Sequence, residues 1–311
     1  MPSMQTPFRA GFVAILGRPN VGKSTLLNRL LGEHVAIVTA RPQTTRTRIL
    51  GVVNGPDYQL ALFDTPGIHK AKGPLNRRMV ETALSTLSEV DVALVLVEAT
   101  TGPGGKVEVG ESAHWIADEV KKRRKPAILG VNKMDRVPRE ALLPVIEAYR
   151  TLHDWAEIVP FSALSGENVD RLVPALARHL PESEAPLFPP DVLTDQAERV
   201  IAAEYVREQV MEQTRDELPY AAAVEVEEFD ESERRDDGGL IRIGALIWVE
   251  RESQKAIVIG KGGAMLKRIG TRARERMERL LGAKVFLRLT VKVEERWSER
   301  LESLRRLGIA P

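Results

Sequence analysis

Residues 12–24 read FVAILGRPNVGKS, and this stretch decides the fold of the N-terminal part of the chain. Residues 12–16 form a continuous apolar run typical of a buried strand, and a loop with the spacing GxxxxGK(S/T) follows before a helical pattern begins. Backbone N–H groups of such a loop converge on phosphate groups, and Lys23 adds a positive charge. The stretch therefore predicts a strand, a loop and a helix that together bind the phosphates of a nucleotide.

We assign nucleotide binding to nine consecutive residues of this loop and the helix after it, and Mg²⁺ binding to the Ser24 hydroxyl. The nine residues are Gly17, Arg18, Pro19, Asn20, Val21, Gly22, Lys23, Ser24 and Thr25. The alternative interpretation is a glycine-rich turn without a ligand. A lysine followed by a serine at this position argues against that alternative.

Aliphatic runs alternate with helix-length segments through the first 180 residues. The runs lie at 12–16, 58–63, 92–97, 127–131 and 158–161, and the helical patterns at 22–31, 75–89, 111–125, 139–153 and 169–180. Continuous aliphatic strands separated by helices are typical of a parallel sheet covered on both faces. Ligands of such sheets bind at the carboxyl ends of the strands, so we expect the nucleotide there.

Residues 132–135 read NKMD and directly follow the strand predicted at 127–131. Asp135 can accept hydrogen bonds from the N1 and N2 donors of guanine, whereas adenine would leave the carboxylate unpaired. We expect Asn132 to brace the loops of the site and the stem of Lys133 to lie over the base. This motif therefore favours GTP over ATP.

Residues 64–67 read DTPG and end the strand predicted at 58–63. Asp64 is placed to reach Mg²⁺ through water, and the Gly67 N–H to meet the γ-phosphate. A simple turn is the alternative for this motif taken alone.

Two further segments complete the predicted site. Residues 43–46 read QTTR and fall between the first helix and the next strand, where a threonine hydroxyl can complete the Mg²⁺ shell; we prefer Thr45 to Thr44. The last segment follows the final strand and can offer the Ala163 N–H to guanine O6. It consists of Ser162, Ala163 and Leu164.

In this order the five motifs resemble the G1 to G5 boxes of the translation-factor-related P-loop GTPases. The resemblance implies a doubly wound α/β fold with a mixed six-stranded sheet, one strand of which is antiparallel. It also implies Mg²⁺-dependent hydrolysis of GTP, with GTP and GDP states. The residues it assigns to hydrolysis are Lys23, Thr45, Asp64 and Gly67, and those it assigns to the metal are Ser24, Thr45 and Asp64.

Two positions bear on the rate of hydrolysis. Many GTPases place a glutamine directly after DxxG to orient the attacking water, whereas this sequence has Ile68, whose side chain cannot hydrogen-bond. We therefore expect that the chain alone hydrolyses GTP slowly and that a group outside these five motifs accelerates the reaction. Members of this branch with asparagine at the position of Asn20 are often stimulated by K⁺, so the resemblance implies K⁺ as a second cofactor.

Residues 180–190 read LPESEAPLFPP, and their four prolines disfavour both helix and sheet. We predict a GTPase domain at 1–180, a proline-rich linker at 181–190 and an RNA-binding domain at 191–311. The net charge is +5 over residues 1–180, −13 over 181–250 and +9 over 251–311. The basic C-terminal region favours a polyanionic partner, although basic helix faces are often merely solvated.

Residues 258–263 read VIGKGG and resemble the (V/I)IGxxG element of KH RNA-binding domains. We predict that they join a strand to the helix that begins at 264. With a helix at 195–215 and strands at 220–229, 240–250 and 284–294, the order indicates a small α+β, type II KH-like domain. The residues assigned to RNA are Ile259, Gly260, Lys261, Gly262, Gly263, Lys267 and Arg268. A glycine turn is the alternative for a GxxG taken alone.

The whole arrangement resembles the Era family of bacterial GTPases along essentially all 311 residues. The resemblance implies a monomer that binds 16S rRNA near its 3′ end, and the 30S subunit, during small-subunit assembly. The absence of cysteine and of a long apolar run favours a cytoplasmic location. Peripheral membrane contact is also implied, and a membrane-surface regulatory GTPase is the alternative function. A metabolic NTPase or tRNA-modifying enzyme is less favoured, because no general base, metal cluster or nucleophile lies outside the nucleotide motifs.

Overall fold

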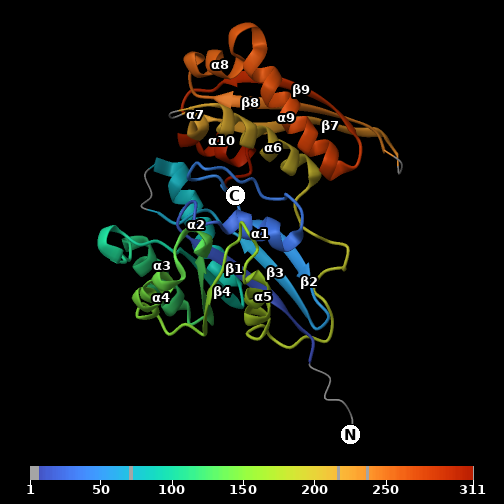
Figure 1. Ribbon diagram of the computed structural model, residues 1–311. Helices are drawn as coiled ribbons and strands as arrows, with labels where there is room; N and C mark the ends of the chain where they lie inside the picture. Colours follow the sequence, from blue (N-terminus) through green and yellow to red (C-terminus); the bar gives the residue numbers. More distant parts are fainter. Residues whose placement is uncertain (1–6, 70–72, 216–217, 236–237, 311) are drawn as a thin grey trace. The chain divides into compact units, whose positions relative to one another are not determined.

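The computed structural model describes residues 7–69, 73–215, 218–235 and 238–310 (Figure 1). These residues form two compact units, each with its own sheet. The first unit comprises the described residues within 1–32, 45–71 and 79–195, and the second those within 33–44, 72–78 and 196–311. The predicted linker at 181–190 thus lies in the first unit, and the predicted domain limits stay a prediction.

The first unit contains a six-stranded sheet with the order β2-β3-β1-β4-β5-β6. Its strands are β1 (Arg9–Gly17), β2 (Ile49–Asn54), β3 (Tyr58–Asp64), β4 (Val92–Glu98), β5 (Ala127–Asn132) and β6 (Glu157–Pro160). All neighbouring pairs are parallel except β2 with β3. The strand β2 is the antiparallel strand implied by the family resemblance, and the aliphatic runs alone did not identify it.

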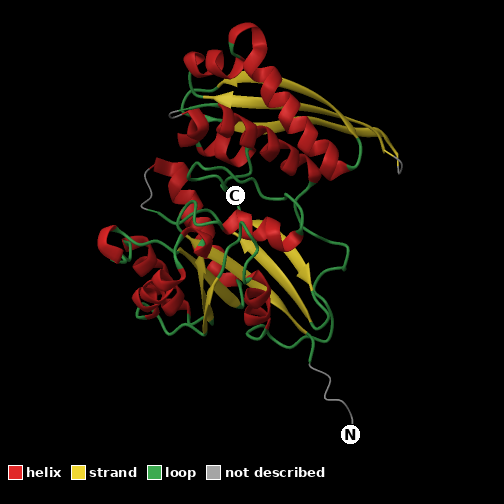
Figure 2. Ribbon diagram, in the orientation of Figure 1, coloured by secondary structure: helices red, strands yellow, loops and turns green. Residues whose placement is uncertain are grey.

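Five helices belong to this sheet and pack on both of its faces (Figure 2). They are α1 (Lys23–Leu31), α2 (Gly73–Glu89), α3 (Glu111–Arg123), α4 (Leu142–Arg150) and α5 (Val169–Ala177). Successive side chains of a strand point to opposite faces of the sheet. On one face the strand residues pack with α2, α3 and α4, and on the other face α1 and α5 contact β1 and β3. Helices therefore cover both faces of the sheet, and the carboxyl ends of the parallel strands lie at one edge.

The proline-rich segment follows this sheet in an extended path. Gln59 on β3 donates from Nε2 to the Phe188 carbonyl at 2.9 Å and accepts the Phe188 N–H at 2.9 Å. Further along, the Val52 N–H donates to the Leu193 carbonyl at 2.9 Å. These bonds satisfy backbone groups that the prolines prevent from forming a helix or a strand of their own.

The second unit is an α+β module with a three-stranded sheet of order β7-β8-β9. The strands are β7 (Ala223–Arg235), β8 (Gly238–Val249) and β9 (Lys284–Val293); β7 is antiparallel to β8, and β9 is parallel to β8. The helices are α6 (Glu198–Gln213), α7 (Leu218–Ala221), α8 (Glu252–Ile259), α9 (Ala264–Leu281) and α10 (Leu301–Arg306). α6 and α9 pack on each other and on the sheet.

One element of the second unit was predicted wrongly. The residues before the glycine loop form the helix α8, not a strand, so the loop joins two helices. The run of β-branched residues at 257–259 favours a strand by propensity. The helix forms because Gln254 Oε1 accepts the N–H groups of Glu250 (2.8 Å) and Arg251 (3.1 Å), while Val258 is buried.

The hairpin of the second unit is also longer than predicted. Residues 230–235 continue β7 and residues 238–239 begin β8, beyond the strands predicted at 220–229 and 240–250. Residues 236–237 lie outside the described part of the chain. Arg242 on β8 donates to Glu233 on β7 at 2.9 Å, and such cross-strand pairs stabilise the extension.

A buried carboxylate joins segments of the second unit that lie far apart in the sequence. Glu208 on α6 has no exposed side-chain surface; it accepts the Val38 N–H at 2.9 Å and forms an ion pair with Arg276 on α9. His34 Nε2 lies 3.1 Å from the same carboxylate. Burial, and then the positive charge of Arg276, lower the pKa of His34 to about 4, so the ring is neutral near pH 7. Residues 33–44 are thus an integral part of this unit.

Trp297 is the largest fully buried side chain of the chain's described part, and its Nε1 donates to the Ala221 carbonyl at 2.8 Å. Its cluster also contains Ala223, Leu304, Ile309 and Ala310. Leu301, the first residue of α10, is 43% exposed and lies outside this cluster. The indole therefore holds α7, β7 and α10 together.

We predict that Trp297→Ala lowers the free energy of unfolding of the second unit by about 3–5 kcal/mol, because it leaves a cavity and an unpaired carbonyl. Urea unfolding followed by circular dichroism measures the effect. Trp115→Ala on α3 is the control, since that indole is 36% exposed. Equal unfolding midpoints for the wild type and Trp297→Ala would contradict the prediction.

Candidate functional site

The loop between β1 and α1 is shaped by close packing. Gly22 has φ of 101°, and a Cβ there would lie 2.3 Å from Asn132 Nδ2, so only glycine fits. Lys23, only 6% exposed, lies along the loop with Nζ 3.3 Å from the Arg18 carbonyl and 3.5 Å from that of Gly17. Because α1 begins at Lys23, the N–H groups of its first turn are available to an anion.

Three oxygen-bearing side chains meet beside this loop. Ser24 Oγ lies 2.5 Å from Asp64 Oδ2 and 3.0 Å from Thr45 Oγ1, and Thr45 Oγ1 lies 3.2 Å from Asp64 Oδ2. The other carboxylate oxygen, Oδ1, is buried and has no hydrogen-bond partner among the described residues. Mg²⁺ prefers hard oxygen ligands of this kind, so the donor set fits the ion.

The hydroxyl of Thr44 has other partners. Thr44 Oγ1 donates to the Arg41 carbonyl at 2.9 Å and lies 3.0 Å from Thr39 Oγ1. Of the two threonines considered from the sequence, the structure therefore places the hydroxyl of Thr45 beside Asp64.

Burial sets the electrostatics of this cluster. Burial raises the pKa of Asp64, and the charge of Lys23 and the hydrogen bonds from Ser24 and Thr45 oppose that shift. Burial likewise lowers the pKa of Lys23, and Asp64 opposes it. The opposite charge offsets only part of the cost of burial at each group, so the pair is suited to receive a cation at Asp64 and an anion at Lys23.

The DTPG segment lies against the same loop. A Cβ at Gly67 would lie 2.8 Å from Pro19, and the Ile68 N–H donates to the Gly17 carbonyl at 3.0 Å. The side chain of Ile68 is buried, with 2% exposed. It therefore anchors the segment and presents no group that could orient a water molecule.

At the other end of the site, Asn132 joins two loops. Its Nδ2 donates to the Val21 carbonyl at 2.7 Å and its Oδ1 accepts the Ala163 N–H at 2.9 Å. The side chain is 2% exposed, so both bonds are protected from water. The structure thus brings residues 17–24, 132–135 and 162–164 to one edge of the sheet. Asp135 is exposed there and has no hydrogen bond to any described residue.

Two residues at this edge were not predicted from the sequence. Arg29 on α1 donates from Nε to the Ala163 carbonyl at 3.1 Å and from Nη2 to the Leu164 carbonyl. Glu98 ends β4 and accepts hydrogen bonds from loop residues. The sequence could have indicated Glu98, because it is an acidic residue at the carboxyl end of a buried strand. No feature of the sequence indicated Arg29.

The glycine loop of the second unit is open. Gly260, Gly262 and Gly263 have φ of 71°, 58° and 80°, and nothing lies within 4 Å of a Cβ placed at Gly262 or Gly263. Lys261 and Lys267 beside it are exposed. A phosphodiester chain can therefore approach this backbone closely.

The other residues predicted to bind RNA differ in exposure. Ile259 is half-buried at the end of α8. Arg268 is turned toward α6, where its Nε donates to Gln213 Oε1 at 2.5 Å. The loop backbone, the two lysines beside it and Arg268 are thus the accessible part of the predicted set, and the Arg268 guanidinium is already bonded to Gln213.

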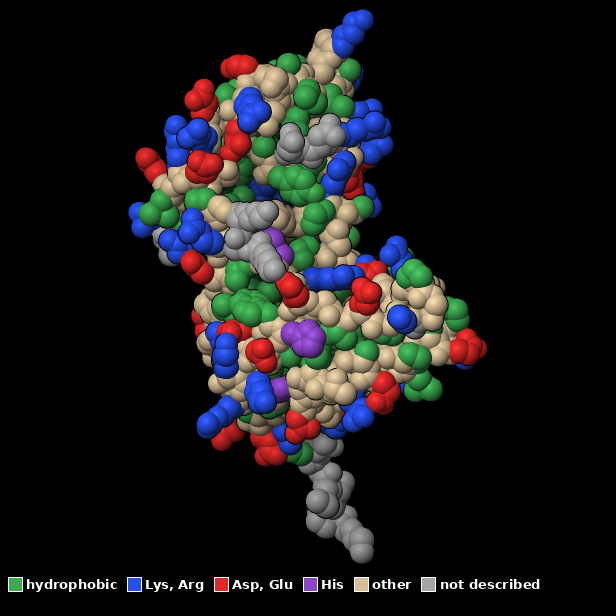
Figure 3. All heavy atoms as spheres, turned by 90° about the vertical axis from the view of Figure 1, so that its left-hand side faces the viewer, with side chains coloured by type: hydrophobic (Ala, Val, Ile, Leu, Met, Phe, Trp, Pro, Cys, Tyr) green, Lys and Arg blue, Asp and Glu red, His purple; other side chains and the backbone are tan. Residues whose placement is uncertain are grey.

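Opposite charges are paired across the second unit. Arg288 on β9 contacts Glu228 on β7 at 2.8 Å, and Lys292 contacts Glu227 at 3.8 Å. On the face drawn in Figure 3, basic and acidic side chains are interspersed. The acidic stretch before residue 250 therefore neutralises part of the basic stretch after it.

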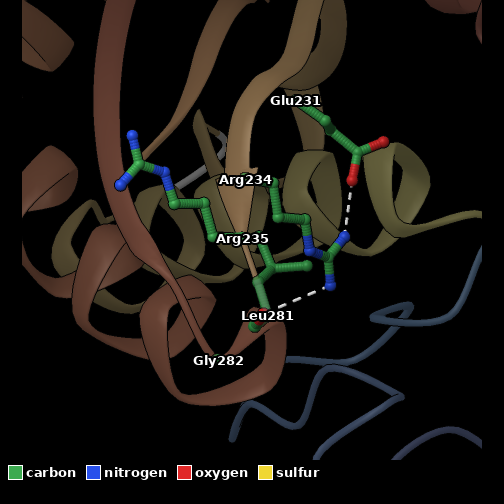
Figure 4. A pocket seen from close by; sticks show the side chains of 5 residues that line it. All are labelled: Glu231, Arg234, Arg235, Leu281 and Gly282. Carbon is green, nitrogen blue, oxygen red and sulfur yellow. Dashed lines mark hydrogen bonds and ion pairs between the residues drawn. The ribbon is translucent and has the colours of Figure 1, made fainter. Parts of the chain in front are cut away.

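A hollow of about 520 Å³ lies between the end of β7 and the end of α9 (Figure 4). It is lined by Glu231, Arg234, Arg235, Leu281 and Gly282. The Arg234 guanidinium is held by Glu198 (2.7 Å), Glu231 and the Leu281 carbonyl. It is thus already paired with two carboxylates, and the hollow contains none of the residues predicted to bind nucleotide or RNA.

Comparison with known proteins identifies both units. A family described as 50S ribosome-binding GTPase matches residues 12–133, and the KH domain family matches residues 217–298. Curated proteins named GTPase Era match almost the full chain: that of Geobacter metallireducens is 52% identical over 97% of this chain and 98% of its own length. The chain belongs to the Era family. The Era protein of Xylella fastidiosa is 47% identical over 97% of this chain and 98% of its own length.

Two solved Era structures share the fold. An Aquifex aeolicus Era variant bound to GDP and AlF₄⁻ is 42% identical, with a TM-score of 0.90 over 98% of this chain and 100% of that one. Era in complex with MgGDPNP and nucleotides 1506–1542 of 16S ribosomal RNA is 43% identical, with the same TM-score and coverage. The predicted fold class, a P-loop GTPase followed by a KH domain, is confirmed. The chain is a GTPase of the Era family.

Proposed function

We propose that this GTPase is an Mg²⁺-dependent switch that binds 16S rRNA near its 3′ end through its KH domain during small ribosomal subunit assembly. The observation that carries the proposal is the buried oxygen cluster of Ser24, Thr45 and Asp64 beside Lys23, in a chain with a KH domain. The similarity to the Era complex with MgGDPNP and 16S rRNA supports both ligands.

Within the nucleotide site each residue has a proposed role. Lys23 and the N–H groups at the start of α1 bind the phosphates, and the Gly67 N–H meets the γ-phosphate. The hydroxyls of Ser24 and Thr45 and the carboxylate of Asp64 would hold Mg²⁺. Bound there, the ion supplies positive charge to the γ-phosphoryl oxygens as hydrolysis proceeds. Asp135 reads the guanine edge, with Asn132 fixing the loops around it.

The glycine loop of the KH domain is the proposed RNA contact. Its open backbone admits a sugar-phosphate chain, and Lys261 and Lys267 supply charge. GTP would order the segments around Thr45 and Gly67 and so bias RNA binding. Linkage then requires RNA to alter nucleotide affinity by the same factor.

K⁺ is a second proposed cofactor. Asn20, the position that suggests it, is exposed in the phosphate loop with φ of 61°. With Ile68 buried, hydrolysis lacks a side chain after DTPG that could orient water, and an added cation near the phosphates would compensate in part.

The remaining expectations stay predictions: a monomer, a cytoplasmic location and peripheral membrane contact. Among the described residues, no helix is long and apolar enough to span a bilayer. The alternative function as a membrane-surface GTPase gains no support from the relatives, whose names describe GTPases and whose solved complex contains rRNA.

We predict that Ser24→Ala and Lys23→Ala each reduce GTP turnover to background, because they remove a metal ligand and the phosphate-binding charge. Phosphate release at saturating Mg²⁺ measures turnover. Ser85→Ala on the exposed surface of α2 is the control. Normal turnover in Ser24→Ala would refute the assigned metal site.

We predict that Asp135→Asn relaxes base selectivity and raises the Kd for GTP about 10- to 100-fold per lost hydrogen bond, since bonds to a charged group contribute about 1.5–3 kcal/mol. Titration calorimetry with GTP and ATP measures both effects. Asp118→Asn, at an exposed position of α3, is the matched control. Unchanged preference for guanine in Asp135→Asn would count against the assignment.

We predict that GTP hydrolysis is fastest with both K⁺ and a short single-stranded RNA from the 3′ end of 16S rRNA. A four-way comparison of turnover in Na⁺ or K⁺ buffer, with and without the RNA, measures each effect. Gly262→Asp should abolish the RNA effect and leave the K⁺ effect, because it adds a strained, negatively charged side chain to the loop only.

Anionic vesicles at two salt concentrations provide the comparison for this experiment. If Gly262→Asp weakens RNA and vesicle binding equally, nonspecific charge attraction explains both. Equal rates of GTP hydrolysis in Na⁺ and K⁺ buffer would refute the proposed role of K⁺. An unchanged rate of hydrolysis on addition of the RNA would refute the proposed coupling between RNA binding and GTP hydrolysis.

A further inference from the structure

Glu98 occupies a central position at the nucleotide edge of the sheet. It is the last residue of β4 and pairs in register with Asn132 at the end of β5, where the Ala99 N–H donates to the Asn132 carbonyl at 2.7 Å. Its side chain is 13% exposed. The carboxylate thus lies between the phosphate loop and the NKMD segment.

The carboxylate bridges these two segments through separate oxygens. Oε2 accepts a hydrogen bond from Arg18 Nη2 at 2.7 Å, and Oε1 lies 3.1 Å from Lys133 Nζ. Arg136 Nη1 lies 3.6 Å from Oε1. One anion therefore holds three cations that come from two separate parts of the chain.

The backbone of Lys133 shows that its position is imposed by its surroundings. Its φ of 65° and ψ of 33° are left-handed, a conformation that is strained for a residue other than glycine. The side chain is only 21% exposed although lysine is usually solvated. Neighbouring bonds to Asn132 and Glu98 maintain this arrangement.

Charge balance explains what the carboxylate contributes. Burial raises the pKa of Glu98, but hydrogen bonds and charge from Arg18 and Lys133 outweigh burial and leave the pKa below its usual range. Glu98 is therefore ionised at neutral pH. Without its charge, three cations would face one another, and their side chains would separate into solvent.

We propose that Glu98 is a positioning residue for guanine-nucleotide binding, which fixes Arg18 and Lys133 before the nucleotide arrives. Preorganisation of this kind raises affinity because the side chains are already ordered before the nucleotide binds. Binding then costs less conformational entropy. The inference rests on the proposed guanine site. It concerns the base end of that site, so it affects GTP and GDP alike.

The test is Glu98→Gln, which keeps the size of the side chain and removes its charge. We expect the Kd for GTP and for GDP to rise about 10-fold, through faster dissociation, with kcat at saturating GTP unchanged because Lys23, Ser24 and Asp64 are not contacted by Glu98. Stopped-flow dissociation of fluorescent GDP measures the dissociation rate, and steady-state kinetics show whether KM rises while kcat stays unchanged. Glu147→Gln, which removes an exposed pair with Arg150 on α4, is the matched control.

A mutant cycle with a variant that carries both Arg18→Met and Lys133→Met separates positioning from a general structural role. If Glu98 acts through these two side chains, Glu98→Gln adds little to the Kd of that variant, whereas independent effects would add. Additive effects, or an unchanged Kd in Glu98→Gln, overturn the inference. Glu98→Asp, which restores the charge, should recover part of the affinity even if Glu98→Gln folds less stably; no recovery also overturns it.

The same measurements keep the two hypotheses apart. If ATP competes with fluorescent GDP as well as GTP does on the wild type, the proposed guanine site fails and the inference fails with it. If the wild type prefers guanine nucleotides while Glu98→Gln binds them normally, only the role of Glu98 is refuted.

Discussion

Burial of the Asn132 side chain is the constraint on which the proposed nucleotide site depends. Its two polar groups bond the backbone of Val21 and Ala163, and leaving either unpaired in the interior would cost about 1–3 kcal/mol. The loop that contains Val21 and the loop that contains Ala163 are therefore held at a fixed distance from each other. Gly22 belongs to the same constraint, because any larger residue would occupy the space of the amide. The packing of a neutral side chain thus fixes the two loops between which we propose that the nucleotide binds.

Charged groups complete the site on either side of that amide. At the phosphate end, Lys23 and Asp64 are both buried and each offsets part of the desolvation of the other. At the base end, Glu98 balances Arg18 and Lys133. The two ends differ in exposure, since the first cluster is enclosed and the second is partly open to water. Ligand charge should therefore matter most at the phosphates and ligand shape most at the base.

The sequence predicted that the motifs meet, because each of them directly follows a buried strand and parallel strands end at one edge of the sheet. It missed β2, whose aliphatic run is interrupted by Gly51; a Cβ there would lie 2.6 Å from Leu27, so helix packing requires the glycine. It also assigned α8 to a strand, because the cap at Gln254 is not visible in a run of β-branched residues. Glu98 belongs to no motif: its role depends on cations that only the fold brings together.

The second unit is not a continuous piece of the chain. Glu208 takes the Val38 N–H from a segment 170 residues earlier, and His34 lies beside the same carboxylate. A fragment that begins after the proline-rich segment would retain Arg276 but lose both of these neighbours. The Glu208 carboxylate of the fragment would then have to bind water or a proton, and the packing of α6 on α9 would weaken. RNA affinities obtained with such a truncated piece would describe a different molecule from the one that the intact polypeptide forms.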